Sequence, residues 1–297
     1  MVYFHFFSPL KSKKYFEDYI LSILSFLNHH YPQHHFSIHY YPQIYPNSFI
    51  QFIQPQHVLI YLFKIPPFVL KHLSHHQKYH PVYLLNTEQL SIPKHNYYIH
   101  VLPRSIHLLD YSLSNIHIKN QHQKKSIYLP YFYNPNEYKE IEKTNEICMI
   151  HPGTQSQRRQ QFLYLCKKNG IKVNIIHGFG NERDNQLFSH KILLNIHFDS
   201  SYQIFEEIRC NRCIHQKMIV ISESSLYHEH NILKKHMIEV PIQQMISKIK
   251  EVQINYHQYH EELFREYDVE KIQEYYKFHT NFWLKNYEIN EVEKNIK

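Results

Sequence analysis

The sequence predicts an α/β protein with two domains, each built on a parallel sheet, followed by a helical tail. Short apolar runs alternate with amphipathic helical segments in both halves of the 297-residue chain, and this alternation is typical of parallel strands joined by right-handed crossovers. The composition, with 43% hydrophobic and 15% aromatic residues, is sufficient for large cores, and the length favours two domains. After Pro241 the pattern becomes helical, and no further strand is expected.

The first half alternates between strands and helices less regularly than the second. Prolines interrupt its pattern at several positions and fix loops there. Around residues 128–136 the strand pattern stops and two prolines bracket a turn, so we expect the linker between the domains at this point. An amphipathic helix is expected at residues 13–28, and strands at residues 2–7, 36–40, 58–63, 82–85, 97–101 and 127–129.

The second half contains all four glycines of the chain, and they fall between Gly153 and Gly180. Two glycine turns each connect a predicted strand to a predicted helix. Right-handed crossovers place such turns at the carboxyl edge of a parallel sheet, where open α/β sheets bind ligands. We expect strands at residues 147–151, 171–177, 192–197 and 218–223, and helices at residues 155–168, 181–189, 243–265 and 269–286.

The 27 histidines do not by themselves indicate a metal site. The chain has no alanine and few glycines, as a coding strand poor in G would produce, and histidine and tyrosine replace much of the usual small-residue content. Chance histidine pairs are therefore expected, whereas a metal site needs converging ligands that their spacing does not show. Cys210 and Cys213 have no second pair, which argues against a zinc or redox role. We expect no metal and no cofactor.

The formal net charge of +7 belongs entirely to the N-terminal half. Residues 1–130 hold eleven Lys or Arg against four Asp or Glu, whereas residues 131–297 hold 22 of each. This imbalance favours an anionic acceptor or an acidic membrane surface as a partner, although lysines that only contact solvent give the same charge. No apolar run could span a membrane, residues 1–10 lack the features of a signal peptide, and four cysteines fit a reducing compartment. We therefore expect a cytoplasmic protein that can associate peripherally with a membrane.

A phosphate site is predicted where the strand at residues 147–151 ends. Gly153 and Thr154 break this strand, and Arg158 and Arg159 follow in the first turns of the next helix. The amino end of a helix offers unpaired N–H groups and the positive end of the helix dipole, and glycine allows the backbone to approach closely. Arginine adds bidentate hydrogen bonds to phosphate oxygens. The alternative interpretation is a simple turn followed by arginines in solvent.

Three further motifs follow in the second half: Gly178-Phe-Gly-Asn-Glu-Arg-Asp184, the strand Lys191-Ile-Leu-Leu-Asn-Ile-His197, and the helix sequence Glu206-Glu-Ile-Arg209. With the arginine helix before them, they make residues 147–223 similar to the donor-binding half of a GT-B glycosyltransferase. In particular, they resemble a divergent group with a Lys-Ile-x-Leu-Asn-x-His strand and a Glu-x-x-Arg helix. The resemblance implies an α/β fold of two Rossmann-like domains with parallel sheets facing across a cleft, and a helical C-terminal tail.

The resemblance also implies a division of the chain into three parts. Residues 1–130 form the acceptor-side domain, residues 131–260 the domain that binds the nucleotide-sugar donor, and residues 261–297 a helical tail that packs back on the N-terminal domain. A helix glutamate is expected to accept hydrogen bonds from the ribose hydroxyls; Glu206 is the candidate and Glu207 the alternative. The chain departs from the common Glu-x7-Glu pattern, because Asp199 stands eight residues before Glu207.

Position in the sheet adds further candidates for the donor site. Asn195, His197 and Glu223 lie at the carboxyl ends of predicted strands, where ligands gather. Lys191 either faces the diphosphate or protects a strand edge with its charge. The predicted donor site comprises Gly153, Thr154, Arg158, Arg159, Gly178, Lys191, Asn195, His197, Glu206, Glu207, Arg209 and Glu223.

The leading hypothesis is a glycosyltransferase that moves a sugar from a nucleotide-diphosphate sugar to a hydroxyl of a glycan, a lipid-linked molecule or another anionic acceptor. Arginine and the helix dipole would stabilise the departing diphosphate without a metal. Glu88, in Asn86-Thr-Glu-Gln-Leu90, and Asp110, in Asp110-Tyr-Ser112, are the candidate catalytic residues of the first domain. The alternative is a nucleotide-binding or nucleic-acid-binding protein without catalysis, including an inactive GT-B relative. Because no nucleic-acid motif is visible, we expect no nucleic-acid partner.

Overall fold

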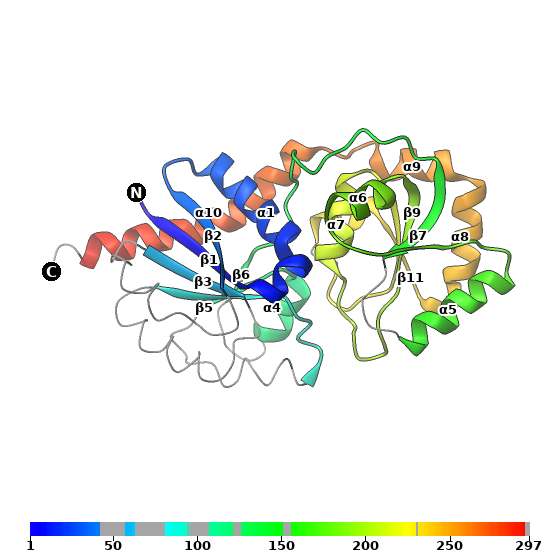
Figure 1. Cartoon of the computed structure of the whole chain (residues 1–297), viewed down its shortest axis with the longest axis horizontal. Helices are drawn as coiled ribbons and strands as arrows, with labels where there is room; N and C mark the ends of the chain where they lie inside the picture. Colours follow the sequence, from blue (N-terminus) through cyan, green and yellow to red (C-terminus); the bar gives the residue numbers. More distant parts are fainter. Residues whose placement is uncertain are drawn as a thin grey trace. The chain divides into compact units, whose positions relative to one another are not determined.

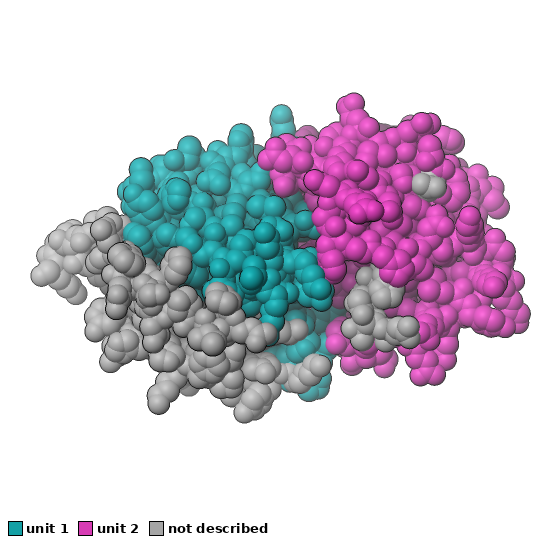
Figure 2. Space-filling model, in the orientation of Figure 1, with its two compact units in different colours: residues 1–132, 270–297 teal, residues 133–269 magenta. Residues whose placement is uncertain are grey.

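The computed structural model describes residues 1–41, 57–62, 81–93, 95, 107–120, 126–150, 156–229 and 231–294. The chain divides into two compact units (Figure 2). Unit 1 consists of Met1–Phe132 together with Glu270–Lys297, and unit 2 consists of Tyr133–Val269. No helix in the described ranges is both long and apolar enough to cross a membrane.

Unit 1 contains a six-stranded parallel sheet with the strand order β2-β1-β3-β4-β5-β6 (Figure 1). The central strands β3 and β4 are buried almost throughout, as expected for strands covered on both faces. The strands are β1 (Tyr3–Pro9), β2 (His35–Tyr41), β3 (His57–Leu62), β4 (Val82–Asn86), β5 (His107–Asp110) and β6 (Ser126–Tyr128); the helices are η1 (Leu10–Ser12), α1 (Lys13–His30) and α4 (Leu113–Asn120).

Two helices from opposite ends of the chain complete the core of unit 1. The apolar face of α1 brings Phe26 against Phe132, with ring centroids 4.0 Å apart. The C-terminal helix α10 (Val269–Lys294) buries Tyr276, whose ring meets Phe132 edge to face at 5.3 Å. Thr280 of α10 also hydrogen-bonds to the Tyr31 hydroxyl, at 2.9 Å. Through these contacts α10 belongs to the same unit as the first 132 residues.

Unit 2 contains a five-stranded parallel sheet with the order β11-β10-β9-β7-β8. Its strands β9 and β10 are buried almost throughout, and the polar residues at their carboxyl ends are buried as well. The strands are β7 (Asn145–Ile150), β8 (Asn174–Ile176), β9 (His190–Asn195), β10 (Ile219–Glu223) and β11 (Ile238–Val240); the helices are α5 (Gln157–Lys168), α6 (Gly180–Phe188), α7 (Glu207–His215), η3 (Ile232–His236), η4 (Ile242–Gln244), α8 (Met245–Ile254) and α9 (Tyr256–Phe264).

A buried ionic cluster fixes the start of unit 2. Arg212 of α7 pairs with Glu137, which lies in a turn of the entry segment, residues 133–144. Arg212 Nη2 also lies 2.9 Å from Asp184 Oδ2 of α6. The flanking Cys210 and Cys213 are free and completely buried. Burial raises the pKa of both thiols, to about 12 for Cys213, so these thiols have no ready thiolate form.

The predicted fold class is confirmed: two α/β units carry parallel sheets, and the C-terminal region is helical. The predicted strand at residues 97–101 lies outside the described residues. Three local predictions were wrong or incomplete. The strand expected at 171–177 is limited to Asn174–Ile176, the helix expected at 243–265 is divided at Asn255 into α8 and α9, and the short strands β5 and β11 have too few apolar residues to produce a clear pattern.

Candidate functional site

The carboxyl edge of the unit 2 sheet gathers most of the predicted donor-site residues that the structure describes. Three adjacent strands, β7, β9 and β10, end at this edge because all are parallel. The turns and helix starts that follow them supply charged and polar side chains. The residues brought together are Arg158, Arg159, Asn195, His197, Glu206, Arg209 and Glu223.

Glu223 links the start of α5 to the segment after β9. Its carboxylate forms an ion pair with Arg158 Nη2 and accepts a hydrogen bond from the backbone N–H of His197, at 3.2 Å. The side chain of Glu223 is 10% exposed and that of Arg158 is 29% exposed. Arg158 Nε is buried and has no hydrogen-bond partner among the described residues. Arg158 is therefore the arginine of this edge that retains both solvent contact and an unused donor.

His197 presents an unused acceptor to the same edge. Its Nε2 lies 3.1 Å from the backbone oxygen of Ser224, and because a carbonyl only accepts, Nε2 carries the hydrogen. Nδ1 is then an acceptor, and it is buried without a partner among the described residues. Burial lowers the pKa of His197, while the charge of Glu223 opposes this shift. The imidazole is thus held neutral, with a lone pair suited to a ligand hydroxyl.

Arg159 has a different environment from its neighbour. Its Nε donates to the backbone oxygen of Ile196, at 2.8 Å, and its guanidinium lies 5.8 Å from the centre of the Phe198 ring. Its backbone N–H donates to Ser156, the N-cap residue of α5. Burial lowers the pKa of Arg159 to about 10, and the nearby positive charge of Arg209 contributes. Arg159 therefore holds the end of β9 in place and has less freedom than Arg158 to reach a ligand.

The two adjacent glutamates also have different positions. Helix α7 begins at Glu207, which is buried, whereas Glu206 precedes the helix and is half-buried. The charge of Glu206 lies close enough to Arg159 and His197 to favour their charged forms. One turn further on, Arg209 Nη1 donates to Asn195 Oδ1 at 3.4 Å, and Asn195 Nδ2 donates to Ser222 Oγ at 3.0 Å. Glu206 is thus the glutamate that shares the environment of the arginine and histidine.

Several predicted donor-site residues are not part of this cluster. Gly153 and Thr154 lie outside the described residues. Lys191 is the second residue of β9, so it lies at the amino end of the strand, where its Nζ pairs with Glu146 Oε1 at 2.6 Å. Gly178 has φ 87°, a left-handed value that favours glycine in the turn before α6.

Glu88 and Asp110, the predicted catalytic acids, lie at the carboxyl ends of β4 and β5 in unit 1. Asp110 is completely buried, and its carboxylate accepts hydrogen bonds from Asn86 Nδ2 at 2.8 Å, Asn115 Nδ2 at 2.9 Å and Ser112 N at 3.1 Å. With three donors and full burial, Asp110 holds Asn86, Asn115 and the backbone of Ser112 in place. The Glu88 side chain is 16% exposed, and its Oε2 lies 3.6 Å from His95 Nε2. Glu88 is therefore the more accessible acid.

Sequence reasoning did not identify the amides that hold the Glu88 loop. Asn86 and Asn115 each donate to the backbone oxygen of Glu88, at 2.9 and 3.0 Å, while they also bind Asp110. Asn86 is the last residue of β4, so its place at the carboxyl edge was a usable signal. Asn115 gave no signal, because it lies in a helix that the pattern did not indicate. Among the described residues, no group of three His, Cys, Asp or Glu is arranged to hold a metal ion.

The chain is similar in sequence to proteins of Acanthamoeba polyphaga mimivirus. It is 32% identical over 234 residues to uncharacterized protein L140, covering 76% of this chain and 71% of that protein. It belongs to the L140 family. Another relative, uncharacterized protein R358, is 28% identical over 236 residues, with 76% of this chain and 81% of the relative covered. The chain spans only 22% of a longer relative, uncharacterized protein L137, at 35% identity. No protein-family model matches the chain.

Solved structures similar to this L140-family chain share its fold. HepE of Anabaena, solved in complex with UDP-glucose, has a TM-score of 0.62 at 9% identity, covering 95% of this chain and all of HepE. Sucrose-phosphate synthase of Thermosynechococcus elongatus has a TM-score of 0.57 at 8% identity, covering 100% and 99% of the two chains. TarM has a TM-score of 0.51 at 14% identity, and the chain spans 55% of its length. The L140-family chain therefore has a GT-B fold.

Proposed function

We propose that this protein is a glycosyltransferase that transfers a sugar from a nucleotide-diphosphate sugar to a hydroxyl of an acceptor. Two observations support the proposal. The GT-B fold is shared with HepE, whose structure contains UDP-glucose. The carboxyl edge of the unit 2 sheet carries Arg158, His197 and Glu206 side by side. The observation that carries most weight is Arg158, a partly exposed arginine with an unused donor in the first turn of a helix.

Arg158 is the residue that we assign to the diphosphate. Charge-assisted hydrogen bonds from a guanidinium to phosphate oxygens are among the strongest polar contacts in proteins. The amino end of α5 adds the positive end of the helix dipole, which favours an anion at the same place. Negative charge develops on the diphosphate as it departs, so both groups stabilise the transition state more than the bound donor. The proposed reaction therefore requires no metal.

Glu206 and His197 are assigned to the neutral parts of the donor. A carboxylate accepts hydrogen bonds from two adjacent hydroxyls, which is the arrangement that a ribose presents. His197 Nδ1 would accept one further hydroxyl, and its burial keeps the ring neutral for that purpose. In unit 1, Glu88 is the candidate that contacts the acceptor, with Asp110 as its anchor. A glycan, a lipid-linked molecule or another anionic acceptor suits the positive charge of residues 1–130.

The proposed function is tested by measuring melting temperatures with a panel of nucleotide sugars, followed by mass spectrometry of any glycosylated product. A ligand that binds only the folded protein adds RT ln(1 + [L]/Kd) to its stability, so at least one donor should raise the melting temperature. Transfer should continue in excess EDTA. If no donor acts and oligonucleotides raise the melting temperature instead, the chain is a nucleic-acid-binding protein. If a donor binds and no transfer or donor hydrolysis follows, the chain is an inactive relative.

A further inference from the structure

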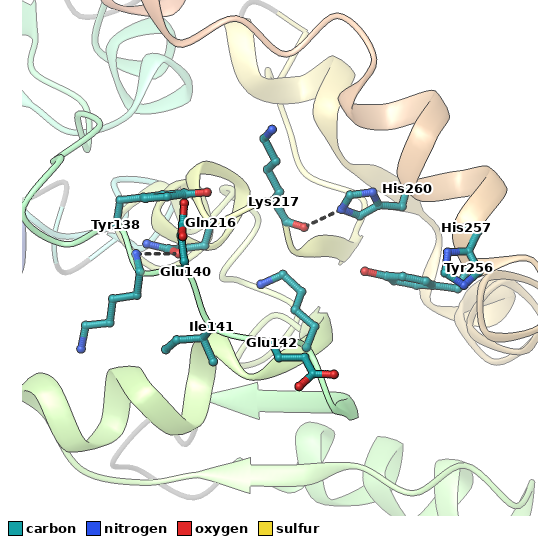
Figure 3. A pocket seen from close by; sticks show the side chains of 11 residues that line it. Tyr138, Glu140, Ile141, Glu142, Gln216, Lys217, Tyr256, His257 and His260 are labelled. Carbon is teal, nitrogen blue, oxygen red and sulfur yellow. Dashed lines mark hydrogen bonds between the residues drawn. The ribbon is translucent and has the colours of Figure 1, made fainter.

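Figure 3 shows an open pocket in unit 2, lined by residues of three segments. Its volume of about 520 Å³ lies in the range of small-molecule sites. Lys143 stands two residues before β7, and Lys217 stands two residues before β10. Because β7 and β10 both run parallel to β9, the two lysines lie at the amino edge of the sheet. Glu223 and Asn195 end their strands at the other edge, so the pocket is separate from the candidate donor site.

Lys143 is a partly buried cation without a paired acid among the described residues. Its Nζ donates to the backbone oxygen of Phe188, at 3.1 Å, and forms no ion pair in the described part of the chain. Burial lowers the pKa of Lys143, because the charged ammonium loses hydration there. An ammonium has three donors, and one carbonyl satisfies only one of them. The remaining donors and the unneutralised charge favour an anionic ligand.

His257 and His260 of α9 also line the pocket. His260 of α9 lies with its Nε2 3.1 Å from the backbone oxygen of Lys217 (Figure 3). Burial lowers the pKa of His260, and repulsion by Lys143, Lys217 and His257 lowers it further. The charge of each of these three groups therefore acts on the His260 ring. Since the carbonyl of Lys217 requires a hydrogen on Nε2, His260 takes up its second proton at Nδ1.

The acids of the pocket do not neutralise this cluster. Glu140 and Glu142 line the pocket on the entry segment, but both side chains are exposed and neither forms an ion pair with Lys143 or Lys217. The remaining walls include the aromatic rings of Tyr138 and Tyr256. Tyr256 is the first residue of α9, which follows α8 after the single residue Asn255. The pocket thus combines aromatic walls with lysines that no acid among the described residues pairs with, although the Lys217 ammonium also lies 6.0 Å from the centre of the Tyr267 ring.

We propose that this pocket is a second ligand site, in which Lys143, Lys217 and His260 bind the phosphate group of a small phosphorylated molecule. The lysine ammonium groups supply charge-assisted hydrogen bonds, and lysine commonly binds phosphate as a point charge. A bound anion also offsets the repulsion among the positive groups. The site does not depend on the proposed transferase activity, because it uses none of the residues assigned to the donor.

The site is tested with inorganic phosphate in an Arg158→Ala background, so that the candidate donor site contributes less. The probe is the NMR signal of the His260 ring, assigned by its loss in His260→Gln. Phosphate should produce a saturable shift that disappears in Lys143→Gln. Lys217→Gln, which removes an exposed lysine and should not disturb folding, is expected to weaken binding by about tenfold or more. Lys250→Gln removes an exposed lysine of α8 and should bind like the parent. Absence of saturation, or equal binding by Lys217→Gln and Lys250→Gln, overturns the proposal.

A second experiment uses sulfate, whose charge stays constant near neutral pH. The groups that face His260 are Lys143, Lys217 and His257, with the exposed Glu140 and Glu142 on the entry segment. Lower pH protonates His260 and adds a positive charge to the pocket. Sulfate affinity should therefore rise between about pH 7.5 and pH 5.5, and most of this rise should be lost in His260→Gln. A rise that is unchanged in His260→Gln contradicts the assignment of this residue.

Discussion

Arg158 and Glu223 form an ion pair that joins the first turn of α5 to the carboxyl end of β10. Glu223 also accepts the backbone N–H of His197, so one carboxylate positions groups from two segments. A ligand phosphate at this edge would compete with Glu223 for the guanidinium. The Arg158 Nε donor has no partner in the described part of the chain, but it is buried, so a phosphate reaches it only if the side chain moves.

The first prediction concerns Arg158. Arg158→Ala should weaken binding of nucleotide diphosphates by about tenfold to a hundredfold, because it removes charge-assisted hydrogen bonds. The parent protein should lose affinity as salt rises, and the variant should lose less. Isothermal titration calorimetry at two salt concentrations measures both effects. Arg265→Ala is the matched control, since Arg265 is exposed and forms an ion pair with the equally exposed Glu261. An equal loss of affinity in Arg158→Ala and Arg265→Ala would show that Arg158 does not bind the diphosphate.

The second prediction separates recognition of ribose from recognition of phosphate. Glu206→Gln replaces a charged acceptor that we assign to the ribose hydroxyls, so it should bind ribose donors about tenfold or more weakly. The affinity of Glu206→Gln for deoxyribose donors should change less. The variant should therefore discriminate less between ribose and deoxyribose donors. Arg158→Ala should weaken both donors equally. Competition binding with paired ribose and deoxyribose nucleotides measures this difference. If Glu207→Gln shows the loss and Glu206→Gln does not, the assignment along α7 is wrong by one residue.

The fold was predictable because the strands of unit 2 have clear signals. The buried strands β9 and β10 each contain an uninterrupted apolar run, at residues 192–194 and 219–221, and polar residues follow each run. No comparable pattern marks β11, a three-residue strand with only partly buried side chains. The break at Asn255 was also hidden, because the residues on both sides of it suit a helix.

The site was predictable in part, because parallel strands bring their carboxyl ends to one edge. This rule correctly grouped Asn195, His197 and Glu223. The same rule argues against a place for Lys191 in the donor site, because this residue lies near the amino end of β9. The difference between Arg158 and Arg159 could not be predicted, because it depends on which side of α5 faces the backbone of Ile196. The amino-edge pocket was also hidden, since its residues come from three distant segments.

The third prediction compares the contributions of the buried Asp110 and the partly exposed Glu88 to the stability of the protein. Asp110→Ala should lower the free energy of unfolding by about 3 kcal/mol, because it leaves the buried donors of Asn86, Asn115 and Ser112 without their acceptor. Glu88→Gln should lower it by less than about 1 kcal/mol, since this side chain is partly exposed. Urea denaturation measures both values. A small loss in Asp110→Ala would show that the hydrogen-bonded network does not stabilise this edge.

The fourth prediction concerns the positive charge of residues 1–130. If this charge serves an acidic membrane surface, the protein should bind vesicles that contain anionic lipid at low salt. Binding should weaken toward about 0.5 M salt, where screening acts within a few ångströms. Co-sedimentation with anionic and neutral vesicles measures the difference. Equal binding to both kinds of vesicle would leave these lysines as ordinary surface residues.

The last prediction concerns three histidines that the sheet of unit 1 brings together. His5 Nδ1 lies 2.9 Å from His39 Nε2, and His5 Nε2 lies 3.1 Å from His57 Nδ1. Burial lowers the pKa of His5 to about 4, and repulsion by His39, His57 and His35 contributes. In the unfolded chain a histidine has a pKa near about 6.5. Between these two values the unfolded state binds the proton more readily than the folded state, so the free energy of unfolding decreases as the pH falls.

His5→Gln should therefore reduce the loss of stability between about pH 6.5 and pH 4. For one such group the slope is at most about 1.4 kcal/mol per pH unit, and it is less here because His5 is only half-buried. Above about pH 7 the difference between variant and parent should be constant, since both states are then neutral at this position. Urea denaturation across this pH range measures the two curves. Parallel curves at all pH values would show that the His5 cluster does not contribute to acid sensitivity.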